Sequence, residues 1–308
     1  MYFILMKIAL GMITKNSYPE LGDVFRRVLL RAVSEIPFDS AILCDDSDVD
    51  DSTCEVFFNI IKQFHLSKII ILIGGGRRST RATARQKVVD HFLKETDCEW
   101  LFFLDDDALL NRGFFKEARR YLEDERVGLV WGLNYDATVE RRTYLERLGI
   151  NYEKYLIEQF WKRGGCHDVF LRREAIEDLR IPPILHVYED YWILRHVLKK
   201  GYNVRIVKTG IVHVNPGRPI SPSLLMYMAR LAKSLGIERA SVKSFLKTCI
   251  GGLPLNLWTG VKAGMGLKRG FIRWRDKTLF RLFLLLTDHS RVDRLLKGLY
   301  SEGHTFPS

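Results

Sequence analysis

The chain has 308 residues, which is long enough to bury one large core with an appendage or two smaller cores. With 47% hydrophobic and 28% charged residues, its composition excludes a disordered or collagen-like protein. The five cysteines are scattered and form no C-x-x-C pair, so they predict neither a disulfide framework nor a zinc site and fit a reducing compartment.

The formal net charge of +11 is unevenly distributed along the chain. Residues 1–220 carry 33 Lys and Arg against 32 Asp and Glu, whereas residues 221–308 carry 15 against 5. A basic C-terminal region predicts contact with an anionic partner, either a membrane surface or a phosphorylated lipid. The alternative is a basic face that is simply solvated.

The N-terminal residues 1–14 are apolar, but they contain a single basic residue and no small-residue cleavage site follows them. We therefore expect a buried first strand instead of a signal peptide. No window reaches the roughly 18 uninterrupted apolar residues that a spanning helix needs. These features predict a cytoplasmic protein, peripheral at the cytoplasmic face of the membrane, with no transmembrane helix.

Short apolar runs alternate with amphipathic runs over the first part of the chain. The short runs are predicted to be buried parallel strands: Lys7–Ile13, Ala41–Cys44, Ile69–Ile73, Leu101–Leu104 and Val127–Trp131. The runs between them have helical spacing: Glu20–Ile36, Ser52–His65, Thr80–Glu95 and Gly113–Leu122. This alternation predicts a doubly wound α/β sheet, whose ligands bind beyond the carboxyl ends of the strands.

The middle of the chain is less regular. We predict helices over Tyr144–Trp161 and Asp190–Lys199, and strands over Asp168–Leu171 and Tyr202–Val207. From Ser221 onward the pattern is helical, with basic residues among large apolar ones. The chain is therefore expected to form a nucleotide-binding domain over residues 1–220 and a helical, basic, amphipathic region over 221–308.

Charged clusters follow three of the predicted strands: Asp45-Asp46-Ser47-Asp48, Gly74-Gly75-Gly76-Arg77-Arg78 and Asp105-Asp106-Asp107. Three such clusters on one edge of a sheet indicate a site. The three adjacent carboxylates at 105–107 repel one another unless a cation neutralises them, and hard divalent ions such as Mg²⁺ or Mn²⁺ favour these oxygen ligands. The alternative for this triplet is a solvated acidic turn.

Five motifs in chain order resemble those of the GT-A fold glycosyltransferases, and specifically the inverting family 2. Asp45-Asp46-Ser47-Asp48 is similar to the early acidic "DDGSTD" motif, and Ala84-Arg85-Gln86 is similar to "ArN". Asp105 and Asp107 match "D-x-D", Glu189-Asp190 matches the "ED" dipeptide, and His213 matches a late histidine. The resemblance covers residues 6–215 and implies a Rossmann-like GT-A nucleotide-sugar-binding domain with a mostly parallel sheet.

The resemblance implies roles for these residues in binding a nucleotide-sugar donor. Asp45 or Asp46 accepts hydrogen bonds from the nucleobase or ribose, and Thr14 lines the same pocket or caps its strand. Arg81 and Arg85 lie four apart on one helical face, a spacing suited to a diphosphate. Their alternative role is surface salt bridging.

The metal, Mn²⁺ or Mg²⁺, is expected to be bound directly by Asp107, with Asp105 or Asp106 contacting ribose or bracing the site. His213 completes the coordination, or is structural. Asp190, beside Glu189, is the expected general base for a single displacement with inversion, although acidic residues also cap helices.

The acceptor is expected to be a glycan or a polyprenyl-linked sugar. The segment Gly164-Gly165-Cys166-His167-Asp168 resembles the family's acceptor side, which places Gly165 and His167 there. The glycines permit close approach of the backbone to a sugar ring. Trp161 and Trp192 stack on the acceptor or belong to the core.

Two other classes of function remain. A nucleotidyltransferase that handles sugar nucleotides would carry a glycine-rich signature after its first strand, where this chain has Thr14-Lys15-Asn16-Ser17. A nucleic-acid-binding module is prompted by the pI of about 9.4 and by residues 268–275, but the same mixture of residues describes a helix in the membrane interface. We therefore expect no nucleic-acid partner.

Overall fold

The computed structural model describes residues 6–47, 52–74, 79–136, 146, 149–214, 220–262, 266–288, 290, 292–293 and 296. Residues 48–51 and 75–78, which belong to two of the predicted strand-end clusters, lie outside the described residues, as does the start of the helix predicted from Tyr144. The chain forms two compact units, residues 1–137 with 156–216 and residues 138–155 with 217–308. The second unit therefore includes residues 138–155 in addition to the region predicted from the sequence.

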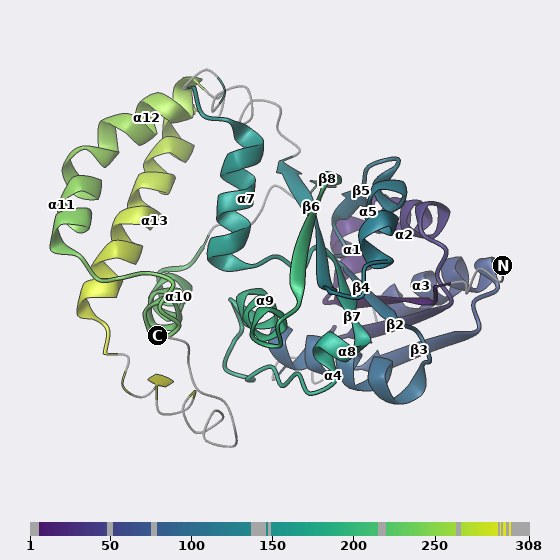
Figure 1. Ribbon diagram of the computed structural model, residues 1–308. Coiled ribbons are helices and arrows are strands. Elements are labelled where there is room, and N and C mark those ends of the chain that lie inside the picture. Colours follow the sequence, from purple (N-terminus) through teal and green to yellow (C-terminus); the bar gives the residue numbers. More distant parts are fainter. Residues whose placement is uncertain are drawn as a thin grey trace. The chain divides into compact units, whose positions relative to one another are not determined.

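The first unit is built on an eight-stranded sheet with the order β3-β2-β1-β4-β7-β6-β8-β5 (Figure 1). The strands are β1 (Ile8–Thr14), β2 (Ser40–Asp45), β3 (Lys68–Ile73), β4 (Trp100–Leu104), β5 (Ala108–Leu110), β6 (Val127–Asp136), β7 (Asp168–Arg172) and β8 (Asn203–His213). Four neighbouring pairs are parallel and three, β4/β7, β6/β7 and β5/β8, are antiparallel. The predicted α/β fold with a mostly parallel sheet is confirmed.

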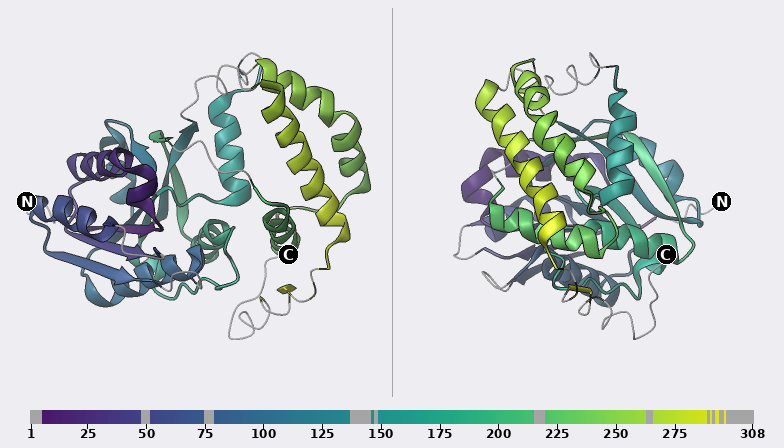
Figure 2. Two further views of the ribbon diagram at one scale, coloured as in Figure 1. Left: turned by 180° about the vertical axis from the view of Figure 1, so that it is seen from behind. Right: turned by 90° about the vertical axis from the view of Figure 1, so that its left-hand side faces the viewer.

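Helices cover both faces of this sheet (Figures 1 and 2). The helices of this part of the chain are α1 (Ser17–Leu21), α2 (Asp23–Glu35), α3 (Thr53–Ile61), α4 (Arg81–Glu95), α5 (Phe114–Leu122), α7 (Tyr152–Arg163), α8 (Arg173–Ile176) and α9 (Glu189–Lys199), with a 3-10 turn at Lys62–Phe64. Successive residues of β1 point toward opposite faces of the sheet and so pack against different helices. Leu10 and Met12 join the core formed with α2 and α3, whereas a Cβ on Gly11 would lie 2.9 Å from Val88 of α4.

One strand lies where the sequence did not place it. β7 inserts between β4 and β6 and runs antiparallel to both. The Val127–Trp131 run, predicted as the next parallel strand after β4, therefore pairs instead with β7 and β8. Buried apolar strands look alike in either direction, so their sequence does not fix strand order.

The second unit is helical in its described residues, as predicted for the C-terminal region. Its helices are α10 (Pro222–Ser234), α11 (Val242–Ile250), α12 (Gly252–Lys262) and α13 (Gly266–Leu286), and α13 packs against the other three. Ser221 caps α10, where its hydroxyl accepts the Leu224 amide at 3.2 Å, and Pro222 occupies the first turn. Among the described residues, no helix combines the length and the apolar character required to cross a bilayer.

Candidate active site

The carboxyl ends of the parallel strands β1, β2 and β4 share one edge of the sheet, which is where ligands bind in such folds. Thr14 ends β1 and is paired in register with Asp45, which ends β2. β4 ends at Leu104, so Asp105, Asp106 and Asp107 leave the sheet at this same edge. Polar groups from three strands therefore meet here.

A buried carboxylate closes the β1–β2 end of the site. Asp45 Oδ1 accepts hydrogen bonds from the Thr14 hydroxyl at 2.9 Å and the Ser47 hydroxyl at 2.7 Å, and its Oδ2 lies 3.5 Å from Cys54 Sγ. Asp45 therefore braces the turn that follows β2. Asp46 is also buried and lies against Gly74, where a Cβ would come within 1.4 Å of Asp46 Oδ1.

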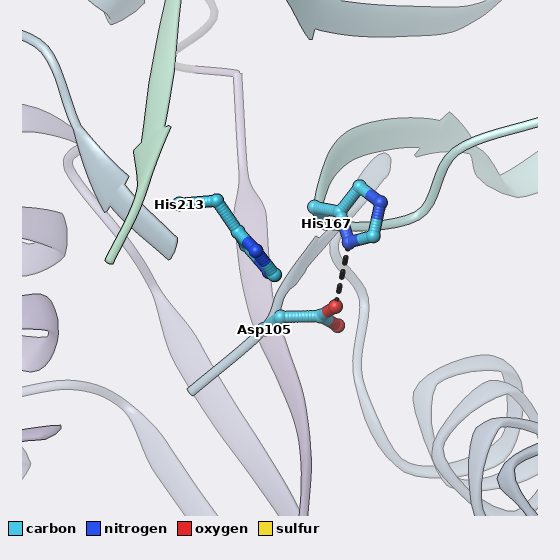
Figure 3. Close-up of side chains that lie close together, drawn as sticks. All are labelled: Asp105, His167 and His213. Atoms are coloured by element: carbon cyan, nitrogen blue, oxygen red, sulfur yellow. Dashed lines mark hydrogen bonds and ion pairs between the residues drawn. The ribbon is translucent and has the colours of Figure 1, made fainter. Parts of the chain in front are cut away.

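Asp105 is held by two side chains from other elements. Its Oδ1 accepts from Arg85 Nη2 at 3.1 Å, and its Oδ2 lies 2.8 Å from His167 Nδ1 (Figure 3). Burial acts against ionisation, but the positive charge of Arg85 and the hydrogen bond from His167 outweigh it and hold the pKa of Asp105 well below its usual range. Asp105 is therefore a carboxylate at neutral pH.

Arg85 is turned into the protein. It is 4% exposed, its Nε donates to Glu189 Oε1 at 3.4 Å and its Nη1 donates to the Cys166 carbonyl at 3.4 Å. The predicted pairing of Arg81 and Arg85 on one surface is therefore not what the structure contains. Arg81, one turn earlier on α4, is exposed at the start of the helix.

His167 reaches Asp105 because of the antiparallel β4/β7 pairing. The register places Leu104 opposite Asp168, and the Asp105 amide donates to the His167 carbonyl at 2.9 Å. The sequence suggested only an acceptor-side role for His167. No periodicity in the sequence reveals this antiparallel neighbour, although the polar His167 directly before an apolar run marks it as a strand-end residue.

Asp107 and His213 form a second pair. β5 pairs with β8 so that Ala108 lies opposite His213, and Asp107 Oδ1 is 2.9 Å from His213 Nε2. Burial lowers the pKa of His213, but the hydrogen bond and charge of Asp107 exceed that effect and raise it above its usual value.

The two histidines lie close together, with ring centroids 5.2 Å apart. Asp105, His167 and His213 each offer one ligand atom, and these three atoms lie within 4.8 Å of one another (Figure 3). A carboxylate with two imidazoles is a donor set that suits a transition metal such as Mn²⁺. The described residues thus fit a divalent cation, although His167, and not the expected Asp107, completes this group of three.

Two other buried carboxyl groups near the site, those of Asp106 and Asp168, have raised pKa values. Asp106 accepts a hydrogen bond from the Ser17 hydroxyl, and burial, with the charges of Asp107 and Asp105, raises its pKa to about 7. Asp168 is fully buried against Gly132, where a Cβ would lie 1.9 Å from Asp168 Oδ2. Burial is the main reason that the pKa of Asp168 is raised well above its usual range.

Glu189 and Asp190 are the first two residues of α9, and Glu189 accepts a hydrogen bond from Arg85, which also donates to Asp105. Burial, together with the charge of Glu189, raises the pKa of Asp190 to about 7. Its Oδ1 accepts from the Tyr191 amide at 2.8 Å. Tyr188, the residue just before α9, has a left-handed backbone with φ 69°. A strained non-glycine residue at this position fixes the direction in which the helix starts.

Two adjacent glycines pack closely on their neighbours, and the first of them lies against the start of α9. Gly164 has φ +77°, and a Cβ there would lie 2.4 Å from the Asp190 carbonyl carbon and the Tyr191 nitrogen. A Cβ on Gly165 would lie 2.7 Å from Nε1 of Trp131. Both glycines are therefore required by close packing within the protein.

The sequence profile of the family described as "Glycosyl transferase family 2" matches residues 10–180. The chain belongs to this family. The match spans more than half of the chain and includes β1, β2, β4 and β7, so the predicted resemblance is confirmed. This family 2 chain is not matched by any curated protein sequence.

Solved structures share the GT-A fold of this glycosyltransferase. The mannosyltransferase PcManGT from Pyrobaculum calidifontis, solved with GDP-Man and Mn²⁺, superposes with a TM-score of 0.55 at 14% identity over 96% of this chain and 88% of its own. TarS from S. aureus gives a TM-score of 0.52 at 14% identity, covering 91% of this chain and 55% of TarS. At these identities the comparisons show the fold alone.

Of the residues predicted for this glycosyltransferase's acceptor side, only His167 belongs to the group of candidate metal ligands. Trp192 donates its Nε1 to the Arg180 carbonyl at 2.9 Å, and Gly165 packs on Trp131. Trp161 is 45% exposed and packs edge-on against Phe160.

Proposed function

We propose that this protein transfers a sugar from a nucleotide-sugar donor to a hydroxyl of a glycan or lipid-linked acceptor, by a metal-assisted single displacement that inverts the anomeric centre. The observation that carries the proposal is the convergence of Asp105, His167, His213 and Asp190 beyond the carboxyl ends of the sheet. Family membership and the GDP-Man and Mn²⁺ bound to a protein of the same fold support it.

The donor's nucleoside is assigned to the β1–β2 end of the site. Asp45 already accepts bonds from Thr14 and Ser47, so it keeps the turn rigid. We assign contact with the base or ribose to Asp46 and to the Thr14 side of the turn, because carboxylates accept bonds from ring N–H groups and hydroxyls. Of the two arginines predicted for the diphosphate, Arg85 is buried and Arg81 is exposed, so we assign the diphosphate to Arg81.

Asp105, His167 and His213 would hold the cation, and Asp107, which is paired with His213, would orient that imidazole. Two imidazole donors favour Mn²⁺ over Mg²⁺, which prefers oxygen ligands and retains its waters. When bound, the ion supplies positive charge next to the diphosphate leaving group. Arg85 contributes through its positive charge, which keeps Asp105 ionised at neutral pH.

Asp190 is assigned as the general base. Its Oδ1 accepts the Tyr191 amide, so we assign Oδ2 to take the acceptor hydroxyl's proton as its oxygen attacks the anomeric carbon. With a pKa of about 7, this carboxylate can receive a proton near neutral pH. Glu189 is bonded to Arg85 and acts on Asp190 through its charge, so it is a positioning residue.

The test begins with a thermal-shift screen of nucleotide-sugars with Mn²⁺, because a donor that binds only the folded state raises the melting temperature. Hydrolysis and transfer are then measured for the donor found, with Mn²⁺ or with chelator. We expect His213→Ala, which removes one of the three assigned ligands, to abolish activity, and Asp190→Asn to abolish transfer while donor binding survives. Asp23→Asn, on the exposed start of α2, is the matched control and should leave both unchanged.

Full activity in chelator or in His213→Ala would contradict the metal assignment. Loss of donor binding in Asp190→Asn would show that Asp190 belongs to the donor site and is not the base.

A further inference from the structure

The large apolar side chains that remain exposed are concentrated on three helices of the second unit. Among the described residues, 15 large hydrophobic side chains are exposed, and nine of these lie on α11, α12 and α13. They are Val242, Leu246, Ile250, Leu255, Trp258, Val261, Leu267, Phe271 and Leu286. The other six are spread over the rest of the chain, so this concentration is a local property of the three helices.

On α11 the exposed apolar residues form a stripe with a basic border. Val242, Leu246 and Ile250 are 61%, 48% and 76% exposed and follow one another at four-residue spacing, which places them on one face of the helix. Lys243 and Lys247, each exposed, follow the first two by one residue and so border the stripe along one side. The opposite face carries Thr248, whose carbonyl accepts the Trp274 indole of α13 at 3.0 Å.

Three large apolar side chains of α12 are exposed. Leu255, Trp258 and Val261 are 55%, 47% and 53% exposed at three-residue spacing. The inward face packs on α13 through glycines: a Cβ on Gly260 would lie 2.9 Å from the Gly270 Cα. Packing within the protein therefore uses one face of α12 and does not account for the apolar character of the other.

The first turns of α13 add both kinds of side chain. Leu267 and Phe271 are 61% and 48% exposed, and Lys268 and Arg269 between them are exposed as well. Over residues 242–286 the sequence contains nine Lys and Arg and a single acidic residue, Asp276. Asp276 is bonded by Arg275 at 2.7 Å. The surface is therefore both apolar and strongly cationic.

We propose that α11, α12 and the start of α13 form a docking surface that lies in the interface of an anionic lipid bilayer. In the structure, α11, α12 and α13 pack side by side and α13 contacts both of the others (Figures 1 and 2). The apolar stripes enter the boundary between headgroups and acyl chains, while the lysines and arginines meet anionic headgroups. Trp258 suits this boundary because an indole combines an apolar ring with a polar N–H.

The combination of apolar and basic side chains favours an anionic bilayer over other anionic partners such as a nucleic acid. A nucleic-acid backbone would be met by the basic residues, but it offers nothing to cover three apolar stripes at helical spacing. A bilayer accommodates both, and no described helix could instead cross it. This proposal does not rest on the proposed reaction, because none of its residues belongs to the donor or acceptor site assigned above.

The experiment is cosedimentation of the full chain with vesicles of phosphatidylcholine alone and of phosphatidylcholine and phosphatidylglycerol in equal amounts. We expect binding to the anionic vesicles only, weakened by added salt. Lys243→Glu with Lys247→Glu should weaken it by more than about fivefold for each lysine replaced. Arg27→Glu with Lys116→Glu, which changes exposed basic residues on α2 and α5 by the same charge, should have a much smaller effect.

The apolar contribution is tested separately. Leu255→Glu on α12 should reduce vesicle binding by about tenfold or more. Leu30→Glu is the matched control, because Leu30 is a similarly exposed leucine (46% against 55%) on α2 of the first unit. Circular dichroism of each variant establishes that its helices are retained.

Equal loss in Leu255→Glu and Leu30→Glu, or binding to neutral vesicles that is as strong as to anionic ones, would overturn the proposal. Tighter binding to single-stranded DNA than to anionic vesicles would overturn it as well and would assign the surface to nucleic acid. Because vesicle binding is measured without any donor, its failure is distinct from failure of glycosyl transfer.

Discussion

Replacing Arg85 by methionine removes the cation that a buried carboxylate, Glu189, and a partly buried one, Asp105, share. The Arg85 side chain is 4% exposed, and it donates to Asp105 at 3.1 Å and to Glu189 at 3.4 Å, whose side chains are 20% and 5% exposed. Breaking such a pair leaves uncompensated buried charge, so we expect Arg85→Met to lower the free energy of unfolding by about 3–5 kcal/mol at pH 7. Arg81→Met, one turn earlier and exposed, is the matched control and should cost less than about 0.5 kcal/mol.

The cost should also depend on pH with a defined sign. In the parent protein the pKa of Asp105 is depressed, so its contribution to stability is present above the unfolded pKa and is lost as pH falls through the folded one. Without Arg85, the burial of Asp105 raises the pKa of this carboxyl, and the penalty is relieved once acid protonates it. The difference between Arg85→Met and the parent should therefore shrink as pH is lowered from 7 toward 4.

The assay is urea denaturation followed by circular dichroism, at several pH values and with chelator present so that a bound cation does not stabilise the folded state. Arg85→Lys keeps the charge but lacks the planar guanidinium whose three nitrogens each reach a different partner, so an intermediate loss of about 1–3 kcal/mol is expected. A loss in Arg85→Met no larger than in Arg81→Met, or one that does not vary with pH, would refute this account of the site.

Further predictions concern the start of α9 and the donor pocket. The base must be deprotonated and the pKa of Asp190 is about 7, so the transfer rate should fall as pH drops below about 7. Glu189→Gln removes a neighbouring negative charge and should move that fall to lower pH. A pH–rate profile that is unchanged in Glu189→Gln would contradict this prediction. Gly164→Ala should reduce kcat strongly and cost more than about 2 kcal/mol in urea denaturation, because its Cβ would lie 2.4 Å from the Asp190 backbone. Gly201→Ala, also at positive φ but in open space, should cost about 1 kcal/mol and leave kcat unchanged, so equal effects at the two glycines would argue against the packing explanation. Thr14→Val removes the hydroxyl bonded at the end of β2 and should weaken donor binding about fivefold by calorimetry; unaltered affinity would place the nucleoside elsewhere.

Much of the fold follows from local pattern. The runs around Leu10, Leu43 and Phe102 are apolar because both faces of their strands are covered, and they alternate with helices that bury one face each. That pattern is sufficient to predict an α/β sheet and to place Asp45 and Asp105 at its carboxyl edge. The GT-A family follows from motifs at those same strand ends, and the profile match confirms it.

The partners of each site residue were not predictable in the same way. Arg81 and Arg85 look equivalent in the sequence, yet one is exposed and the other is buried between two carboxylates, because only one faces the sheet. A helical spacing fixes which residues share a face approximately, but the packing of that helix decides which side chain is enclosed.

Sequence by itself determined that carboxylates and a histidine would emerge at the ends of buried strands, since strand periodicity and turn residues are local properties. Tertiary structure alone decided which of them meet. His167 reaches Asp105 because β7 inserts antiparallel beside β4, and His213 reaches Asp107 because β5 pairs with β8. Those pairings join residues 62 and 106 positions apart, and no local pattern specifies contacts over such separations because strand order is set by the packing of the whole sheet.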